Sequence, residues 1–409
     1  MGFNIMGILN LYILLYQFVG FGFLYTYYFP DRLDEGISNY SLITATLFYT
    51  GGTIILLHLG YFVGKLILKS KVKILAQLAP KNNHKKKYRT ILMMTALCAL
   101  ITVIFYVNIG VENLAFSAIV NNLNSNDVAL ARSSMTNSYE GKLHWIQLFT
   151  DDLFLFGIIY LMLSYMVNKE ISRVTLVILI LIFSFKLILT TQKAPLIDFL
   201  LLIFLTKNFL FKRLKLFSLN NIKGLSIIFI TLVFIYSLFM GSLNMNDAIL
   251  QIGSRVFAGQ LQVSYLYLEY FPNLHSFLQG TSFPNPGGLL PFENFPLTQA
   301  VHTWAHPEMA KAGIIGSMPT FFWGELYANF GTIGVIIITP IVGFILYTIN
   351  QILYHYSKTL IGMTLYVYCI FYFKDLALTS LSNFLFDFNF YIIILFTLIV
   401  EYINIKKMF

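Results

Sequence analysis

The stretch PTFFWGELYANFGTIG, residues 319–334, places a carboxylate and an amide at the start of a long apolar run. If the stretch is helical, Glu325 and Asn329 are four residues apart and share one face. A charged group inside a membrane span costs roughly 2.5–3.5 kcal/mol, so Glu325 needs a role there. It can accept a proton or position a substrate hydroxyl group. The alternative is a structural hydrogen bond to a neighbouring span. The same helix would carry three small residues suited to close helix packing, Gly324, Ala328 and Gly331. It would also carry three aromatic residues suited to a membrane interface, Phe321, Phe322 and Trp323.

Three basic residues are candidates for binding a phosphate group: Arg132, Lys193 and Arg255. The planar guanidinium of arginine matches phosphate oxygens and does not lose its charge by titration. If the three side chains converge, they can hold a pyrophosphate at the membrane surface. The alternative is that each pairs with a nearby acid, such as Glu112, Asp127 or Glu269.

Other charged residues lie within or beside apolar runs. Lys186 precedes Lys193 by seven residues, which places it on the same helical face and about 10 Å deeper. Lys186 either has a role within the span or extends to the surface, and Asp198 can neutralise one of the two lysines. Asp151 and Asp152 can hold a metal ion, but stabilisation of a helix N-terminus explains them more simply.

His302 and His306 are four residues apart and would share a face of a helix. Two histidines are too few for a metal site, so we expect hydrogen bonding or acid–base chemistry on a substrate. The alternative is that both are structural loop residues. Without a metal-binding motif in the sequence, we expect a metal-independent reaction with no cofactor.

The elements that must position these residues are membrane helices. Of the 409 residues, 57% are apolar and 11% charged, whereas soluble proteins carry about 25% charged residues. Cys98 and Cys369 lie in apolar runs and are expected to be buried and unpaired. The sequence predicts an all-α polytopic membrane protein, a single domain over 1–409, with ten spans at about 4–28, 39–68, 90–110, 146–167, 174–191, 194–211, 225–243, 320–353, 359–380 and 383–404.

The distribution of basic residues predicts the topology. Nineteen of the 27 Lys and Arg residues fall in the hydrophilic segments on one side, which places both termini and these segments in the cytoplasm. The net charge of +9 therefore reflects topology and anionic lipid, and no nucleic-acid partner is expected. Two long loops, 111–145 and 244–318, then face outward. The second is expected to form ordered turns and short helices on the outer membrane face, including an amphipathic aromatic-rich stretch after Arg255.

The sequence of residues 317–334, SMPTFFWGELYANFGTIG, resembles the signature of the O-antigen and capsule repeat-unit polymerases (Wzy-type). That family shows a proline, an aromatic pair and then Gly-Glu-x-Tyr-x-Asn-Phe-Gly after a large periplasmic loop, so Tyr327 joins Glu325 and Asn329 as a family residue. The likeness covers most of the chain in layout but some 20 residues in sequence. Arginines in the outward loops are typical of the family, and the resemblance implies the same role for Arg132 and Arg255. Lys193 departs from the family pattern, which has an arginine at that position.

The resemblance implies a membrane glycosyltransferase of GT-C type in a bacterial inner membrane, with its active site facing the periplasm. The growing glycan on undecaprenyl pyrophosphate would be the donor, and a new lipid-linked repeat unit would supply the attacking hydroxyl. Arg132, Lys193 and Arg255 would stabilise the departing pyrophosphate. Glu325 and His302 would act as base or in positioning, and Asn329, Tyr327 and His306 would position the sugars. Membrane lipids, a chain-length regulator and a flippase are the implied partners.

Two other functions share this layout. An O-antigen ligase also uses a lipid-linked donor and a long outward loop. A lipid-linked oligosaccharide flippase or sugar transporter is the rival from another class. Transporters gather charge at the membrane midplane between repeated halves, whereas the polar features here cluster at outer helix ends and no repeat is visible.

Overall fold

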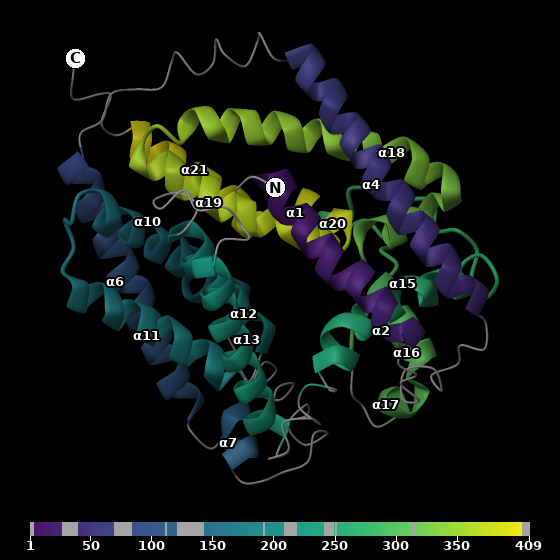
Figure 1. Ribbon diagram of the computed structural model, residues 1–409, viewed down its shortest axis with the longest axis horizontal. Helices are drawn as coiled ribbons and strands as arrows, with labels where there is room; N and C mark the ends of the chain where they lie inside the picture. The colour runs from purple at the N-terminus through teal and green to yellow at the C-terminus, as the bar shows by residue number, and fades with distance from the viewer. Residues whose placement is uncertain are drawn as a thin grey trace. The chain divides into compact units, whose positions relative to one another are not determined.

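The computed structural model describes residues 4–26, 40–68, 84–110, 113–120, 143–190, 193–207, 219–240, 249, 252–311 and 316–402. Every regular element in these ranges is helical, as the sequence predicted, and no strand occurs among them (Figure 1). Seven of the described helices are long and apolar enough to cross a membrane: Ile5–Leu24, Ser41–Leu68, Lys87–Ile109, Trp145–Asn168, Phe322–Tyr356, Leu360–Ala377 and Leu381–Glu401. The protein is therefore a membrane-embedded all-α protein.

The seven spans match seven of the ten that the sequence predicted. The other three predicted spans also form helices, namely α11 (Arg173–Leu189), α12 (Lys193–Leu205) and α13 (Leu219–Met240). A crossing needs about 20 apolar residues. The helix α11 has 17 residues, and the apolar stretches Ala194–Leu205 and Ile222–Phe234 are shorter. Ten spans therefore stay a prediction.

The chain divides into two compact units, each assembled from three separate segments. Unit 1 comprises Met1–Leu75, Ile249–Ile352 and Ile370–Asp387, and unit 2 comprises Ala76–Ala248, Leu353–Cys369 and Phe388–Phe409. Besides α18 (Phe322–Tyr356), most of which lies in unit 1, the described helices of unit 1 are α1 (Ile5–Ile13), η1 (Leu14–Val19), α2 (Gly20–Thr26), α4 (Tyr40–Leu68), η5 (Gly253–Ala258), α15 (Gly259–Tyr270), η6 (Pro286–Gly288), α16 (Leu297–Ala305), α17 (Pro307–Lys311), η7 (Lys374–Ala377) and α20 (Leu381–Leu385). Besides α11, α12, α13 and most of α19 (Leu360–Phe373), those of unit 2 are α6 (His84–Ile109), α7 (Ala115–Val120), α9 (Leu143–Gln147), η3 (Leu148–Leu153), α10 (Phe154–Val167) and α21 (Phe388–Tyr402).

The helix α15 lies in the core of unit 1. It contacts α2, α4 and α16, and all eight residues from Leu261 to Leu268 are buried. The prediction of an amphipathic surface helix is therefore wrong for α15, because even its polar residues Gln262 and Ser264 are enclosed. The prediction of short helices and ordered turns within 244–318 is confirmed for the part of that segment that the structure describes.

The helices α4 and α18 of unit 1 approach each other backbone to backbone. A Cβ atom added at Gly60 of α4 would lie 1.8 Å from the carbonyl oxygen of Pro340 in α18. One added at Gly343 of α18 would lie 2.1 Å from that of Leu57 in α4. The sequence had placed close helix packing at Gly324, Ala328 and Gly331. At Gly324 the atom nearest to an added Cβ belongs to Thr320 of its own segment, at 2.4 Å, so close packing of another helix there stays a prediction.

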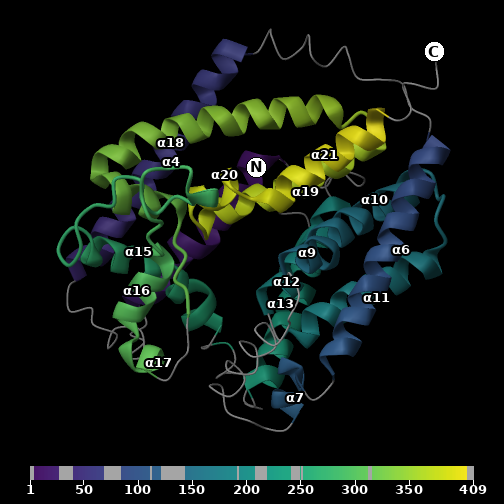
Figure 2. The same cartoon turned by 180° about the vertical axis from the view of Figure 1, so that it is seen from behind.

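In unit 2, α10 packs against α6, and the two helices lie side by side in both views (Figure 1, Figure 2). At Gly157 of α10 an added Cβ would lie 2.1 Å from Thr95 Oγ1 of α6, which explains the close contact. Cys98 and Cys369 are free and buried, as predicted.

Candidate functional site

The first site is built around a break in α18. Gly331 has φ 64° and ψ −158°, a combination that glycine adopts far more readily than other residues. Because of the break, the carbonyl groups of Ala328 and Asn329 lose the N–H donors that an unbroken helix would supply. These accept the backbone N–H groups of Leu278 (3.0 Å) and Gln279 (2.9 Å) instead. The helix expected over 320–334 is thus interrupted, and the loop before α16 is joined to the span at the break.

Glu325 lies less than two turns before the break and is 2% exposed. Its Oε1 accepts hydrogen bonds from Ser382 Oγ (2.5 Å) and Ser282 Oγ (3.3 Å), and its Oε2 accepts one from the Ser382 backbone N–H (2.9 Å). Ser382 is the second residue of α20, where backbone N–H groups have no partner within the helix. The Glu325 carboxylate therefore caps α20 and holds Ser282 at the same time.

Asn329 completes this group of buried polar side chains. Its Nδ2 donates to Ser282 Oγ (2.7 Å) and to the Glu325 carbonyl oxygen (2.8 Å), and its Oδ1 accepts the Gly280 N–H (2.9 Å). Glu325 and Asn329 thus share one face, as predicted, and both contact Ser282. We call Glu325, Asn329, Ser282 and Ser382 the carboxylate network.

Tyr327 lies two residues beyond Glu325 and so projects from a different side of α18. Its ring packs edge-on against Tyr49 (5.2 Å between ring centroids) and Phe277 (5.7 Å), and Trp323 stacks on Tyr49 at 5.1 Å. The structure therefore places Tyr327 in an aromatic cluster rather than in the carboxylate network. The prediction that residues 321–323 anchor at a membrane interface is wrong, because all three side chains are fully buried.

The two histidines meet each other. His302 of α16 and His306 at the end of that helix have ring centroids 5.0 Å apart. His302 is buried, and an added Cβ at Gly316 would lie 2.1 Å from its Nε2, so the ring is tightly enclosed. The shared face is confirmed, and the chemical role of the pair stays a prediction.

The predicted phosphate-binding residues lie largely outside the described structure. Arg132 is not among the described residues. Lys193 is the first residue of α12 in unit 2, and Arg255 lies in η5 of unit 1, but the side chains of both are outside the described part. The predicted convergence of the three therefore stays a prediction.

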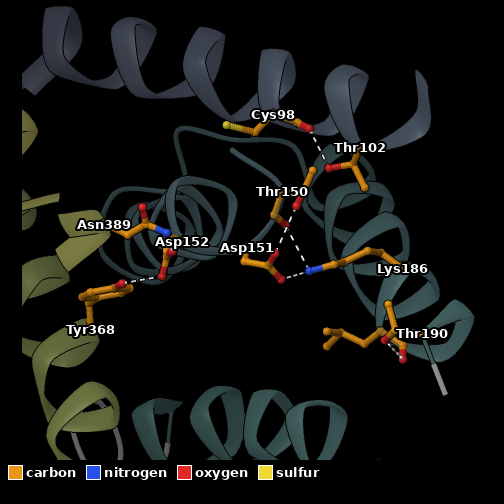
Figure 3. Close-up of polar contacts among 10 residues, drawn as sticks. Cys98, Thr102, Thr150, Asp151, Asp152, Lys186, Thr190, Tyr368 and Asn389 are labelled. Carbon is orange, nitrogen blue, oxygen red and sulfur yellow. Dashed lines mark hydrogen bonds and ion pairs between the residues drawn. The ribbon is translucent and has the colours of Figure 1, made fainter. Parts of the chain in front are cut away.

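A second group of charged side chains, around the buried Lys186, lies in unit 2 (Figure 3). Lys186 of α11 is 4% exposed, forms an ion pair with Asp151 and donates to the Thr150 carbonyl oxygen (3.5 Å). Asp152 accepts hydrogen bonds from Tyr368 Oη (2.8 Å) and Asn389 Nδ2 (2.9 Å).

This group corrects two expectations. Lys186 does not extend to the surface, and its ion-pair partner is Asp151. Asp151 and Asp152 do not stabilise a helix N-terminus, because η3 follows α9 directly and both residues lie more than one turn inside the Trp145–Asn168 span. The segment η3 is π-helical, a conformation that occurs often at functional sites.

Ser282, Ser382 and a further ion pair, that of the buried Lys374, were not predicted from the sequence. Ser380 and Ser382 in the stretch TSLSNF carried a usable signal, since serine between two apolar runs marks helix starts. No comparable signal marked Ser282. Lys374 pairs with Asp375, and its Nζ lies 4.9 Å from the Tyr12 ring centroid, in a stretch that had been assigned to an apolar span.

The Glu325 carboxylate is buried and already accepts hydrogen bonds from two hydroxyl groups and one backbone amide. A substrate hydroxyl therefore reaches it only if the surrounding residues move. Nearby in unit 1, Tyr267 donates to the Met318 carbonyl oxygen (2.9 Å). Burial, and secondarily the charge of Glu325, raise the pKa of Tyr267, which keeps the phenol protonated.

Among the described residues, no three His, Cys, Asp or Glu side chains gather as a metal site.

No protein-family model matches the chain, and no curated protein or solved structure is significantly similar to it. The functional argument therefore rests on the residues themselves.

Proposed function

We propose that this protein polymerises lipid-linked oligosaccharide repeat units, as Wzy-type polymerases do. The observation that carries the proposal is the segment 317–334, whose motif residues Glu325 and Asn329 meet in one buried polar network. A motif that only stabilised a membrane span would not need to hold a loop serine and the start of α20 together. The network organises the region where α18 meets the long segment that precedes it.

In this proposal the protein lies in a bacterial inner membrane with ten spans, and both termini are in the cytoplasm. The loops 111–145 and 244–318 face the periplasm. The acceptor hydroxyl oxygen attacks the anomeric carbon of the donor glycan. The bond from that carbon to the pyrophosphate breaks, and undecaprenyl pyrophosphate leaves with the electron pair.

In this proposal, one set of residues supplies positive charge and another positions the substrates. Arg132, Lys193 and Arg255 bind the leaving pyrophosphate, where fixed positive charge stabilises the transition state most. Glu325 and Asn329 position the segment that carries the acceptor site.

The remaining candidate residues act on the sugars. His302 takes the proton of the attacking hydroxyl, or transfers it to water, and His306 and Tyr327 contact the sugars. No metal or cofactor enters this scheme, and a flippase and a chain-length regulator act beside the enzyme.

One observation favours a second function, transport of a lipid-linked oligosaccharide. Lys186 and Lys374 are both buried and each pairs with an aspartate in or beside an apolar helix, an arrangement found along transport pathways. A transporter moves a finished unit across the membrane, whereas a polymerase extends it afterwards.

Analysis of lipid-linked and surface glycans in a deletion strain separates these functions. Loss of a polymerase leaves surface glycans of a single repeat unit. Loss of a transporter leaves the units on the cytoplasmic side, and loss of a ligase removes surface O-antigen while lipid-linked polymer accumulates. Complementation with Arg255→Ala should give single repeats if the protein still inserts. Normal ladders would exclude the role of Arg255.

A further inference from the structure

A cavity of about 710 Å³ lies within unit 2 between α6, α7 and α11. Its wall is apolar almost throughout and includes Val103 and Val107 of α6 and Leu181 and Phe185 of α11. These four side chains are also large exposed hydrophobic groups of the protein surface. Because α6 is a membrane span, the surroundings of this wall are hydrocarbon, and a lipid chain can enter the cavity without crossing water.

The cavity lies near the ends of two helices, α6 and α11. On α11 its lining runs from Leu181 to Leu189, eight residues or about 12 Å along the axis. This approaches half of the roughly 30 Å hydrocarbon thickness of a bilayer, the depth of one leaflet. The helices α6 and α11 end at or just beyond the cavity, at Ile109 and Leu189. The cavity is therefore placed for the chain of a lipid whose head group lies at that membrane surface.

Among the described residues that line the cavity, Lys186 is the one with an aspartate, glutamate, histidine, lysine or arginine side chain. The hydroxyl groups of Thr102 and Ser117 also line it, but they donate to carbonyl groups of their own segments, Cys98 (2.7 Å) and Leu114 (2.6 Å). Lys186 lies three residues before the end of α11, near the level of lipid head groups. The wall thus joins a hydrocarbon surface to a single positive charge.

The hydrogen bonds of Lys186 leave room for an anionic ligand. A lysine ammonium group has three N–H donors. One is directed to Asp151 and a second, at 3.5 Å, to the Thr150 carbonyl oxygen. Among the described residues no oxygen atom accepts the third, and Nζ lies 5.4 Å from the Phe183 ring centroid. Lys186 lines the cavity and Asp151 does not, so a phosphate oxygen held in the cavity approaches the ammonium group from the cavity side.

We infer that the cavity binds an anionic membrane phospholipid. One hydrocarbon chain lies against the apolar wall, and a phosphate oxygen of the head group accepts a hydrogen bond from Lys186. This site is separate from the carboxylate network of unit 1 and does not depend on the polymerase proposal. Asp151 competes with the lipid for Lys186, so it limits how tightly the head group is held.

Native mass spectrometry of the purified full-length protein in detergent tests the inference. The probes are phosphatidylglycerol and phosphatidylcholine with identical palmitoyl and oleoyl chains. The first should bind about tenfold more tightly, which corresponds to about 1.4 kcal/mol. Lys186→Met should remove the preference, whereas Asp151→Asn should increase it because the competing carboxylate charge is gone. Equal affinities for the two lipids in both the wild type and Asp151→Asn would overturn the inference.

A matched pair of tryptophan variants tests the place of binding. Leu181→Trp fills the cavity and should weaken binding of both lipids about tenfold. Val177→Trp lies one turn earlier on the same exposed face of α11, outside the cavity wall, and should change neither affinity. Equal effects of the two variants would place the lipid elsewhere. Glycerol 1-phosphate, which has the phosphate but no chain, should not compete with phosphatidylglycerol, and effective competition would show that the cavity is not needed. If Lys186→Met does not fold, Asp151→Asn and the tryptophan pair still decide.

Discussion

The carboxylate network gives a prediction that separates a framework role of Glu325 from a chemical one. Glu325→Gln keeps the shape of the side chain and one acceptor oxygen. That oxygen can face the Ser382 N–H, while the new amide group donates to the oxygens of Ser382 and Ser282. The network keeps its contacts but loses the charge. A framework role therefore predicts that Glu325→Gln folds and remains active.

The magnitudes follow from the three hydrogen bonds of the carboxylate. Glu325→Gln exchanges charge-assisted bonds for neutral ones, which should lower the free energy of unfolding by about 1 kcal/mol. Glu325→Ala leaves the Ser382 N–H buried without an acceptor, which costs about 1–3 kcal/mol, and opens a cavity besides. The two serine hydroxyls lose less, because Ser382 Oγ lies 3.3 Å from Ser380 Oγ and Ser282 Oγ still accepts from Asn329. We expect a total loss of about 3 kcal/mol for Glu325→Ala.

Thermal unfolding in detergent measures these stabilities, and glycan ladders in complemented cells measure activity. Ser382→Ala is the matched control, since it removes a donor from the network but keeps the carboxylate. In the framework role, activity follows stability across Glu325→Gln, Ser382→Ala and Glu325→Ala. A Glu325→Gln protein that is as stable as Ser382→Ala but makes only single repeats would refute this reasoning. It would identify Glu325 as a base, whose loss costs about 10²–10⁴-fold in rate.

Three further predictions test the fold. Gly331→Ala should destabilise the protein by about 1–3 kcal/mol, because its φ of 64° disfavours a side chain; an unchanged melting temperature would show that α18 is not broken there. Gly60→Ala should lower the melting temperature because its Cβ would collide with the Pro340 carbonyl group, whereas Gly51→Ala on the same helix meets no atom within 4 Å and should be neutral or slightly stabilising. Burial raises the pKa of the Glu269 carboxyl above its ordinary value, so its contribution to stability is largest below that value and declines as the pH rises towards the folded-state pKa. Glu269→Gln should therefore raise the melting temperature at neutral pH but not below about pH 4, and the same gain at both would contradict this explanation.

The sequence was sufficient for the class of fold because long apolar runs leave helices as the only economical structure in a membrane. It also placed Glu325 and Asn329 together, since their spacing of four residues determines a shared face. It failed where a residue's surroundings come from distant segments. The helix α15 has the polar residues of a surface helix, and only the packing of α2, α4 and α16 around it makes it a core element.

The partners of charged residues were beyond sequence reasoning for the same reason. Lys186 and Asp151 are 35 residues apart, and Ser382 is 57 residues from Glu325. The length of the predicted span 320–353 suggested a break, but its position at Gly331 was hidden because glycine is frequent in membrane helices and also serves as a packing residue. In each case the contact joins segments that are distant in the sequence, and no local sequence pattern indicates which segments pair.

The backbone bonds from Leu278 and Gln279 to the broken end of α18 have a consequence for local unfolding. These amide hydrogens are part of the same hydrogen-bonded ladder as the span, although they belong to the long segment before it. The loop cannot open there without exposing carbonyl groups of the membrane helix, which is costly in hydrocarbon. Loop and helix end should therefore exchange their amide hydrogens as one cooperative unit, so that any opening of the loop at this point also opens the end of the helix.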